Sequence, residues 1–336
     1  MTRTAAARIG AETTPGGADP FDPARLVAFR RSVLGWYRRA GRRFPFRGPT
    51  DPYLVLVSET ILQQTQVSRG GPAWERFTAR FPTVEALAAA SPADVIRAWH
   101  GLGYNRRAVD LRRAAITVAE DLGGRFPRDV AGLERLPGVG PYTARAVASI
   151  AYGLPVGAVD TNVRRVLGRV FAGELQPTKR ALQDLADDLA QVERPGDWTA
   201  AMMDLGSTVC RPRSPRCDVC PVAGLCRSAR VVASDPTGHT GSSPGRRRSE
   251  PARRAGSPAI PFHRTNRWLR GRIVDRLRAV DGDGWLVFGE SIGAHDRDSV
   301  LAALGALADE GLVELASEDG SAEGPGVSSR ARLPLA

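Results

Sequence analysis

Lysine is almost absent from this chain: Lys179 is the only one among 47 basic residues, and the other 46 are arginines. Long apolar runs are missing too, and no hydrophobic segment follows the arginines near the N-terminus. Without such segments, neither a membrane-spanning helix nor a secretory leader is predicted, so a cytoplasmic location without a membrane partner is expected. Runs of alternating apolar and polar residues, which would predict strands, are missing between residues 23 and 200.

The surplus of positive charge favours a polyanionic partner. The 47 basic residues face 36 acidic ones, which gives a formal net charge of +11. A basic chain of this kind most often binds nucleic acid. A coding bias toward arginine would produce the same surplus, so charge alone does not decide the matter.

Cysteine occurs in one stretch only, CRPRSPRCDVCPVAGLC over residues 210–226. Its four members stand as C-x6-C-x2-C-x5-C, and the chain has no other cysteine to pair with them: Cys210, Cys217, Cys220 and Cys226. In a cytoplasmic chain, four grouped thiols predict a metal centre and not disulfides. One tetrahedral zinc ion or one [4Fe–4S] cluster would accept four thiolates, and the spacing leaves both open.

Composition divides the chain into five parts. Residues 1–20 are rich in Ala, Thr, Gly and Pro and are expected to be disordered, whereas residues 21–226 show helical periodicity broken at Gly or Pro. A flexible basic linker is expected over 227–262. The pattern over residues 263–325 predicts two helices and a short strand pair, which is typical of a winged helix. Residues 326–336 are expected to form a tail. The predicted fold class is all-α, with this small winged-helix-like domain at the C-terminal end.

The segment LPGVGPYTAR, residues 136–145, predicts a tight turn between two helices. Gly138 and Gly140 permit positive φ and close approach around Val139, and the following proline suits the first turn of a helix. Free N–H groups at that helix start can hold one DNA phosphate without reading a base. An ordinary helix–helix turn would have the same sequence. The residue after this proline is Tyr142, so this position of the turn carries a phenol and not the amine of a lysine.

The hairpin, a later aspartate in AVDTNVRRVLGRV and the cysteine pattern occur in one chain. This combination resembles the helix–hairpin–helix DNA glycosylase superfamily of endonuclease III and the MutY-type adenine glycosylases, over residues 25–226. The resemblance implies a two-lobed all-α core and favours one [4Fe–4S] cluster over zinc. The cysteine loop would then be a structural clamp that offers three arginines to phosphates: Arg211, Arg213 and Arg216. The stretch RGPTDPYLVLVSETILQQTQV resembles the MutY branch, because a glutamate precedes Leu-Gln-Gln-Thr.

Two carboxylates are the catalytic candidates. Glu59 shares a predicted helix face with apolar side chains, and burial should raise its pKa toward neutrality, as a general acid requires; a carboxylate on a solvated face is the alternative. Asp160 precedes a helix, where a capping carboxylate stays ionised and can stabilise a positive sugar. The resemblance makes Asp160 the catalytic aspartate. Asn162 could fix water or Asp160, or could simply be a polar residue in the first helical turn.

The resemblance also implies the reaction, which is hydrolysis of the N-glycosidic bond of adenine mispaired with guanine or 8-oxoguanine after the base has been flipped out. Gln64 and Tyr104 match family positions whose side chains insert into the opened base stack of the DNA. Arg47 matches a family position near the pocket that holds the flipped base. Tyr142 occupies the position from which an amine attacks the sugar in the related lyases. Since a phenol cannot form a Schiff base, a monofunctional glycosylase is expected.

The sequence leaves other functions possible. The residues after the linker look too few and too helical for the Nudix-like domain with which full-length MutY-type enzymes recognise 8-oxoguanine. A thymine or oxidised-pyrimidine glycosylase of the same fold is one alternative, and a non-catalytic DNA-binding protein is another. Leu-Gln-Gln-Thr favours the adenine branch, and the presence of both Glu59 and Asp160 argues against a non-catalytic protein. A monomer that binds mismatched double-stranded DNA is expected.

Overall fold

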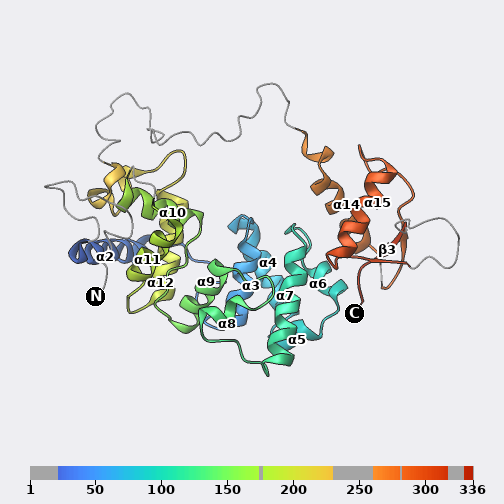
Figure 1. Cartoon of the computed structure of the whole chain (residues 1–336), viewed down its shortest axis with the longest axis horizontal. Coiled ribbons are helices and arrows are strands. Elements are labelled where there is room, and N and C mark those ends of the chain that lie inside the picture. The colour runs from blue at the N-terminus through green and yellow to red at the C-terminus, as the bar shows by residue number, and fades with distance from the viewer. Residues whose placement is uncertain (1–21, 174–176, 230–259, 281, 317–328, 336) are drawn as a thin grey trace. The chain divides into compact units, whose positions relative to one another are not determined.

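The computed structural model describes residues 22–173, 177–229, 260–280, 282–316 and 329–335 (Figure 1). They form two compact units. The described residues of unit 1 are 22–55, 127–135, 139–173 and 177–229, and those of unit 2 are 56–126, 136–138, 260–280, 282–316 and 329–335. The predicted disordered N-terminus and most of the predicted linker lie outside the described residues.

Unit 1 is helical, as predicted. Its main helices are α2 (Pro23–Ala40), α8 (Val130–Glu134), α9 (Pro141–Tyr152), α10 (Thr161–Leu167), α11 (Lys179–Leu189) and α12 (Pro195–Asp204). Two short helical segments continue α10 and α12: η2 (Gly168–Ala172) and η3 (Leu205–Val209). Two more lie in the cysteine loop: η4 (Cys217–Val219) and η5 (Ala223–Leu225). Phe29 of α2 lies at the centre of the core, with ring centroids 5.0 Å from Phe171 and 5.9 Å from Trp198. Helix α2 therefore packs into the same core that the cysteine loop contacts.

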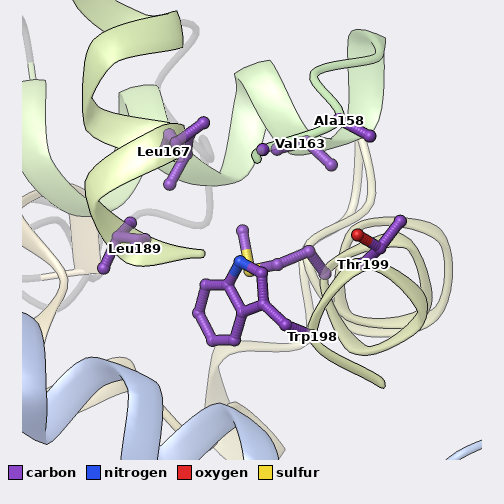
Figure 2. Close-up of a pocket in the computed structure, with 9 residues that line it drawn as sticks. Ala158, Val163, Leu167, Leu189, Trp198 and Thr199 are labelled. Carbon is purple, nitrogen blue, oxygen red and sulfur yellow. The ribbon is translucent and has the colours of Figure 1, made fainter. Parts of the chain in front are cut away.

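A small pocket lies in this core, among α10, α11 and α12 (Figure 2). The side chains of Leu167, Leu189 and Val163 lie around the Trp198 ring. All nine lining residues are non-ionisable, so the pocket offers no acid, base or charge for catalysis. It belongs to the packing of unit 1.

Unit 2 begins within α3 (Pro52–Leu62), which starts in unit 1. It continues through α4 (Val67–Arg80), α5 (Val84–Ala89), α6 (Pro92–Ala98), α7 (Arg106–Ile116) and η1 (Thr117–Asp121). Phe77 and Trp99 pack edge to face in its interior, with ring centroids 5.6 Å apart. None of the helices described in either unit is long and apolar enough to cross a membrane.

The C-terminal residues add η6 (Phe262–Arg264), α14 (Asn266–Arg278), α15 (Arg297–Asp309) and three short strands to unit 2. The strands are β1 (Leu286–Val287), β2 (Glu314–Leu315) and β3 (Arg330–Arg332), in the order β1-β3-β2 and antiparallel throughout. The prediction of a tail over 326–336 is therefore wrong for β3, which is the central strand. Ala331 is buried between two exposed or half-exposed arginines, which is the alternation of a strand with one face on a core.

Candidate functional site

Glu59 lies in the middle of α3 and is 8% exposed, as predicted. Its neighbours Ser58 and Thr60 are buried too, and the Thr60 hydroxyl donates to the Leu56 carbonyl at 2.8 Å. The helix is fixed at its start by Asp51, whose carboxylate accepts from the backbone N–H of residue 53 at 2.8 Å. A carboxyl group in such an apolar helix is shielded from bulk water, as a general acid requires.

Asp160 caps α10 with one carboxylate oxygen and is held by Asn162 with the other. Oδ1 accepts from the Val163 backbone N–H at 2.7 Å, and Oδ2 accepts from the Asn162 side-chain amide at 2.9 Å. Asp160 is therefore the predicted N-cap, and Asn162 bonds to it as predicted. The cap leaves the catalytic role of Asp160 possible in geometry, and that role stays a prediction. A carboxylate held at both oxygens is pre-organised for electrostatic stabilisation of a cation.

Arg165 connects this aspartate to the cysteine loop, and the sequence analysis missed it. Its Nη2 donates to the Asn162 carbonyl oxygen Oδ1 at 2.8 Å and to the Gly206 carbonyl at 2.7 Å. Its Nε donates to the Cys210 carbonyl at 2.8 Å. Asn162 and Arg165 are three residues apart on α10 and so share a face, which was the available signal.

The four cysteines are partly buried, and three of them, Cys210, Cys220 and Cys226, pack against the core of unit 1. Burial, together with the charges of the other three cysteines, raises the pKa of the Cys220 thiol to about 11. Because four thiolates repel one another in this way, a bound cationic centre would stabilise them together. Among the described residues, no three His, Cys, Asp or Glu side chains are grouped to hold a metal ion. The donor set fits an iron–sulfur cluster, because such clusters are held by cysteine thiolates and commonly by four of them.

Arg169 fixes the first part of the cysteine loop. Its Nη1 donates to the Arg211 carbonyl at 2.8 Å and approaches the Cys210 sulfur at 3.4 Å, and its Nη2 donates to the Pro212 carbonyl at 2.8 Å. The three predicted phosphate-binding side chains of this loop are exposed: Arg211, Arg213 and Arg216. The loop therefore has a backbone fixed by Arg169 and three exposed arginine side chains, which suits contact with phosphates.

The predicted helix–hairpin–helix is formed by α8 and α9, which pack against each other. Gly138 has φ +73, and a Cβ there would lie 2.7 Å from the Asp110 Cβ. Gly140 is the N-cap of α9, and Val139 between the glycines is buried. A residue with a side chain would be strained at Gly138 on both counts. Binding of a phosphate by this turn stays a prediction.

Tyr142 and Lys179 lie in different surroundings. Tyr142, in the first turn of α9, is partly buried, and its hydroxyl lies 3.6 Å from the Met203 sulfur. Lys179 is exposed at the first residue of α11, behind the capping residue Thr178. The expected surface location of the single lysine is thus what the structure shows.

Gln64 and Tyr104 have an unusual backbone conformation. Within the described ranges they are the only non-glycine residues with positive φ, +55° and +47°. Such strain occurs where the surrounding structure enforces it, often at functional sites. Arg107 binds the backbone beside both residues: its Nη1 donates to the Gln63 carbonyl at 2.5 Å and its Nη2 to the Gly103 carbonyl at 3.2 Å.

The sequence analysis also missed Arg107. Its guanidinium lies 5.4 Å from the Trp99 ring centre and donates to the Thr60 carbonyl at 2.7 Å. Burial lowers the pKa of Arg107 to about 10, so the side chain is still charged at neutral pH. One partly buried cation therefore joins the end of α3 to the turn that carries Tyr104.

Arg47 forms an ion pair with the buried carboxylate of Asp204. Its two terminal nitrogens each donate to a carboxylate oxygen of Asp204 at 2.8 Å, and Arg42 binds the same carboxylate at 2.6 Å. Burial alone would raise the pKa of Asp204, but the hydrogen bonds from Arg47 and Arg42 lower it below its ordinary value. These contacts give Arg47 a structural role in unit 1. Its predicted contact with DNA stays a prediction.

Comparison with known proteins gives two family matches. Residues 57–191 match the model of the HhH-GPD superfamily base excision DNA repair protein, and residues 210–226 match the iron–sulfur binding domain of endonuclease III. The second match covers all four cysteines and indicates an iron–sulfur cluster and not zinc.

Individual proteins agree with the family matches. An adenine DNA glycosylase from Mycolicibacterium smegmatis is 41% identical over 256 residues, which cover 73% of this chain and 79% of that protein. The human adenine DNA glycosylase is 43% identical over 227 residues, 64% of this chain but 42% of the human protein. A solved structure of a thermostable thymine-DNA glycosylase is 30% identical with a TM-score of 0.59, over 62% of this chain and 98% of that one.

Proposed function

The chain belongs to the HhH-GPD superfamily of base-excision repair glycosylases, among relatives named adenine DNA glycosylase, and we propose that it removes adenine mispaired with guanine or 8-oxoguanine. The observation that carries the proposal is Glu59, a buried carboxyl on α3 in the sequence context of the adenine branch. The enzyme hydrolyses the N-glycosidic bond and acts on double-stranded DNA. We propose further that it acts in the cytoplasm as a monomer.

The surroundings of the two carboxylates support a different role for each. Glu59, shielded from water, would protonate a ring nitrogen of the flipped adenine and turn it into a neutral leaving group. Asp160, held by Val163 and Asn162, would stabilise the positive charge that develops on the sugar. Addition of water at C1′ then leaves an abasic site, and the proton of that water is released.

The proposal is tested by base release from three duplexes that differ only opposite the target adenine. We expect free adenine from the duplexes with guanine or 8-oxoguanine, and none from the duplex with thymine, because unpairing costs least at a mispair. Chromatography of the released base measures the result directly. Equal release from all three duplexes would contradict mispair specificity.

The iron–sulfur cluster gives a separate prediction. The four cysteines would hold one [4Fe–4S] cluster whose part is to fix the loop that presents Arg211, Arg213 and Arg216. Freshly purified protein should be brown, absorb broadly near roughly 400 nm and contain about four irons per chain. Cys217→Ser should lower the iron content and weaken DNA binding. A colourless protein with one zinc per chain would refute the cluster.

Gly206 offers a test of how Asn162 is held. A Cβ at Gly206 would lie 2.7 Å from the Asn162 Cβ, whereas a Cβ at Gly168 would meet nothing within 4 Å. Gly206→Ala should therefore displace Asn162 and slow adenine release by up to about a hundredfold. Gly168→Ala is the matched control and should stay close to the unchanged protein. Single-turnover rates at saturating protein measure both, and equal rates would show that the position of Asn162 is unimportant.

A further inference from the structure

The C-terminal domain, described over residues 260–280, 282–316 and 329–335, shares a hydrophobic core with the helices on either side of Tyr104. Ala93 and Ile96 of α6 and Val109 of α7 lie in one buried cluster with apolar residues of α14 and α15. The backbone N–H of Ala93 donates to the Pro334 carbonyl at 2.9 Å, and Arg97 donates to the Gly282 carbonyl at 2.8 Å. The domain is thus part of unit 2 and is not a separate module within it.

One face of α14 holds the turn that carries Tyr104. Arg278, whose side chain is 9% exposed, donates from Nε to the Ile96 carbonyl at 3.0 Å and from Nη2 to the Asn105 side-chain oxygen at 2.8 Å. Asn105 follows Tyr104 directly and is the N-cap residue of α7. This contact fixes the backbone next to the strained residue.

The same helix reaches the Tyr104 ring. The Arg267 guanidinium lies 4.1 Å from the centre of that ring, and the Arg107 guanidinium lies 5.5 Å from it. Tyr104 is nevertheless 40% exposed, and Arg267 is exposed as well. A stacked guanidinium restricts an aromatic side chain while leaving its edge accessible to a partner.

The charge of this surface fits DNA. Over residues 262–278 the chain has six arginines and one acidic residue, Asp275, which is bound by Arg278 at 2.9 Å. Four of these arginines are exposed: Arg264, Arg267, Arg272 and Arg276. Within the described part of the chain, none of these four arginines forms an ion pair with an acidic residue. An exposed aromatic ring next to such arginines is suited to contact with a negatively charged nucleic acid and its stacked bases.

We propose that Arg267 is a positioning residue for Tyr104, and that the C-terminal domain thereby belongs to the surface that probes the mispaired duplex. Arg267 holds the ring in the orientation from which it enters the base stack, and a flexible tyrosine would pay the ordering cost on binding. The inference rests on the proposed function, because the A·G duplex used to test it is the proposed substrate. It gives this domain a task that does not involve recognition of 8-oxoguanine by a Nudix-like fold.

The test is a double-mutant cycle on the full-length protein. Wild type, Arg267→Ala, Tyr104→Ala and the double variant are titrated with an A·G duplex whose target adenosine carries a 2′-fluorine, which slows cleavage. We expect Arg267→Ala to weaken binding about tenfold, the scale of a well-formed cation–π contact. In the Tyr104→Ala background the same change should cost less than about twofold, because the residue on which Arg267 acts is gone.

Two controls separate positioning from charge and folding. Arg297→Ala removes an equally exposed arginine of the same domain at the start of α15 and should change binding less than about twofold. Fluorescence of 2-aminopurine beside the mispair reports unstacking, and it should fall with Arg267→Ala although thermal unfolding is unchanged. Additive losses in the cycle, or unchanged binding and fluorescence in Arg267→Ala, would overturn the inference. Because the readout is binding, it remains decisive even if the protein releases no adenine, a result that would refute the proposed function instead.

Discussion

Replacing Glu59 by glutamine is expected to slow adenine release by about a thousandfold while the affinity for an A·G duplex changes little. Glutamine has nearly the same shape but cannot donate the proton that makes adenine a good leaving group. Glu59 is buried in α3, so the substitution also removes no surface charge that could attract DNA. Single-turnover rates and a binding titration measure the two effects separately.

Asp160→Asn should have a loss of similar size, for a different reason. Asparagine can still accept the Val163 N–H and cap α10, but it has no negative charge to stabilise the sugar cation. Glu75→Gln, on the exposed side of α4, and Asp296→Asn, at the exposed N-cap of α15, are the matched controls and should be fully active. Full activity in Glu59→Gln or Asp160→Asn would mean that the wrong carboxylate has been assigned.

Substituting lysine for Tyr142 is expected to change the type of reaction. The native chain has no amine in the hairpin, and its single lysine is exposed at the start of α11. It should therefore release the base with water and leave the strand intact until alkali is added. An amine at position 142 could form a Schiff base with the sugar and lead to strand cleavage.

Borohydride trapping measures this difference. The native protein should give almost no covalent adduct with a cleavable duplex, and Tyr142→Lys should give an adduct in an appreciable part of the molecules. Lys179→Ala should behave like the native protein. Strong trapping by the native chain that is lost in Lys179→Ala would show that the exposed lysine reaches the abasic sugar.

Features encoded by neighbouring residues could be predicted from the sequence. The capped Asp160, the buried Glu59 and the glycine turn before α9 each depend on residues within one helical turn. The cysteine cluster could be predicted for the same reason, because its four members lie within 17 residues, 210–226. These elements also carry the family resemblance.

Contacts between distant parts of the chain could not be predicted. The Arg47–Asp204 pair spans 157 residues, and Arg107 binds carbonyls 44 to 47 residues earlier in the chain. A buried arginine has the same letter as a solvated one, and the chain has 46 of them. Strand β3 was missed because three residues show too little alternation to stand out from a tail. The positive φ of Tyr104 likewise follows from its surroundings and not from its residue type.

Base release from a panel of four duplexes tests the central claim most directly. The duplexes contain A·G, A·8-oxoguanine, T·G or thymine glycol opposite adenine, and each is incubated with excess full-length protein. The account predicts adenine from the first two duplexes, no base from the other two, and no strand cleavage before alkali. Release of thymine from T·G or of the oxidised pyrimidine, without release of adenine, would contradict it.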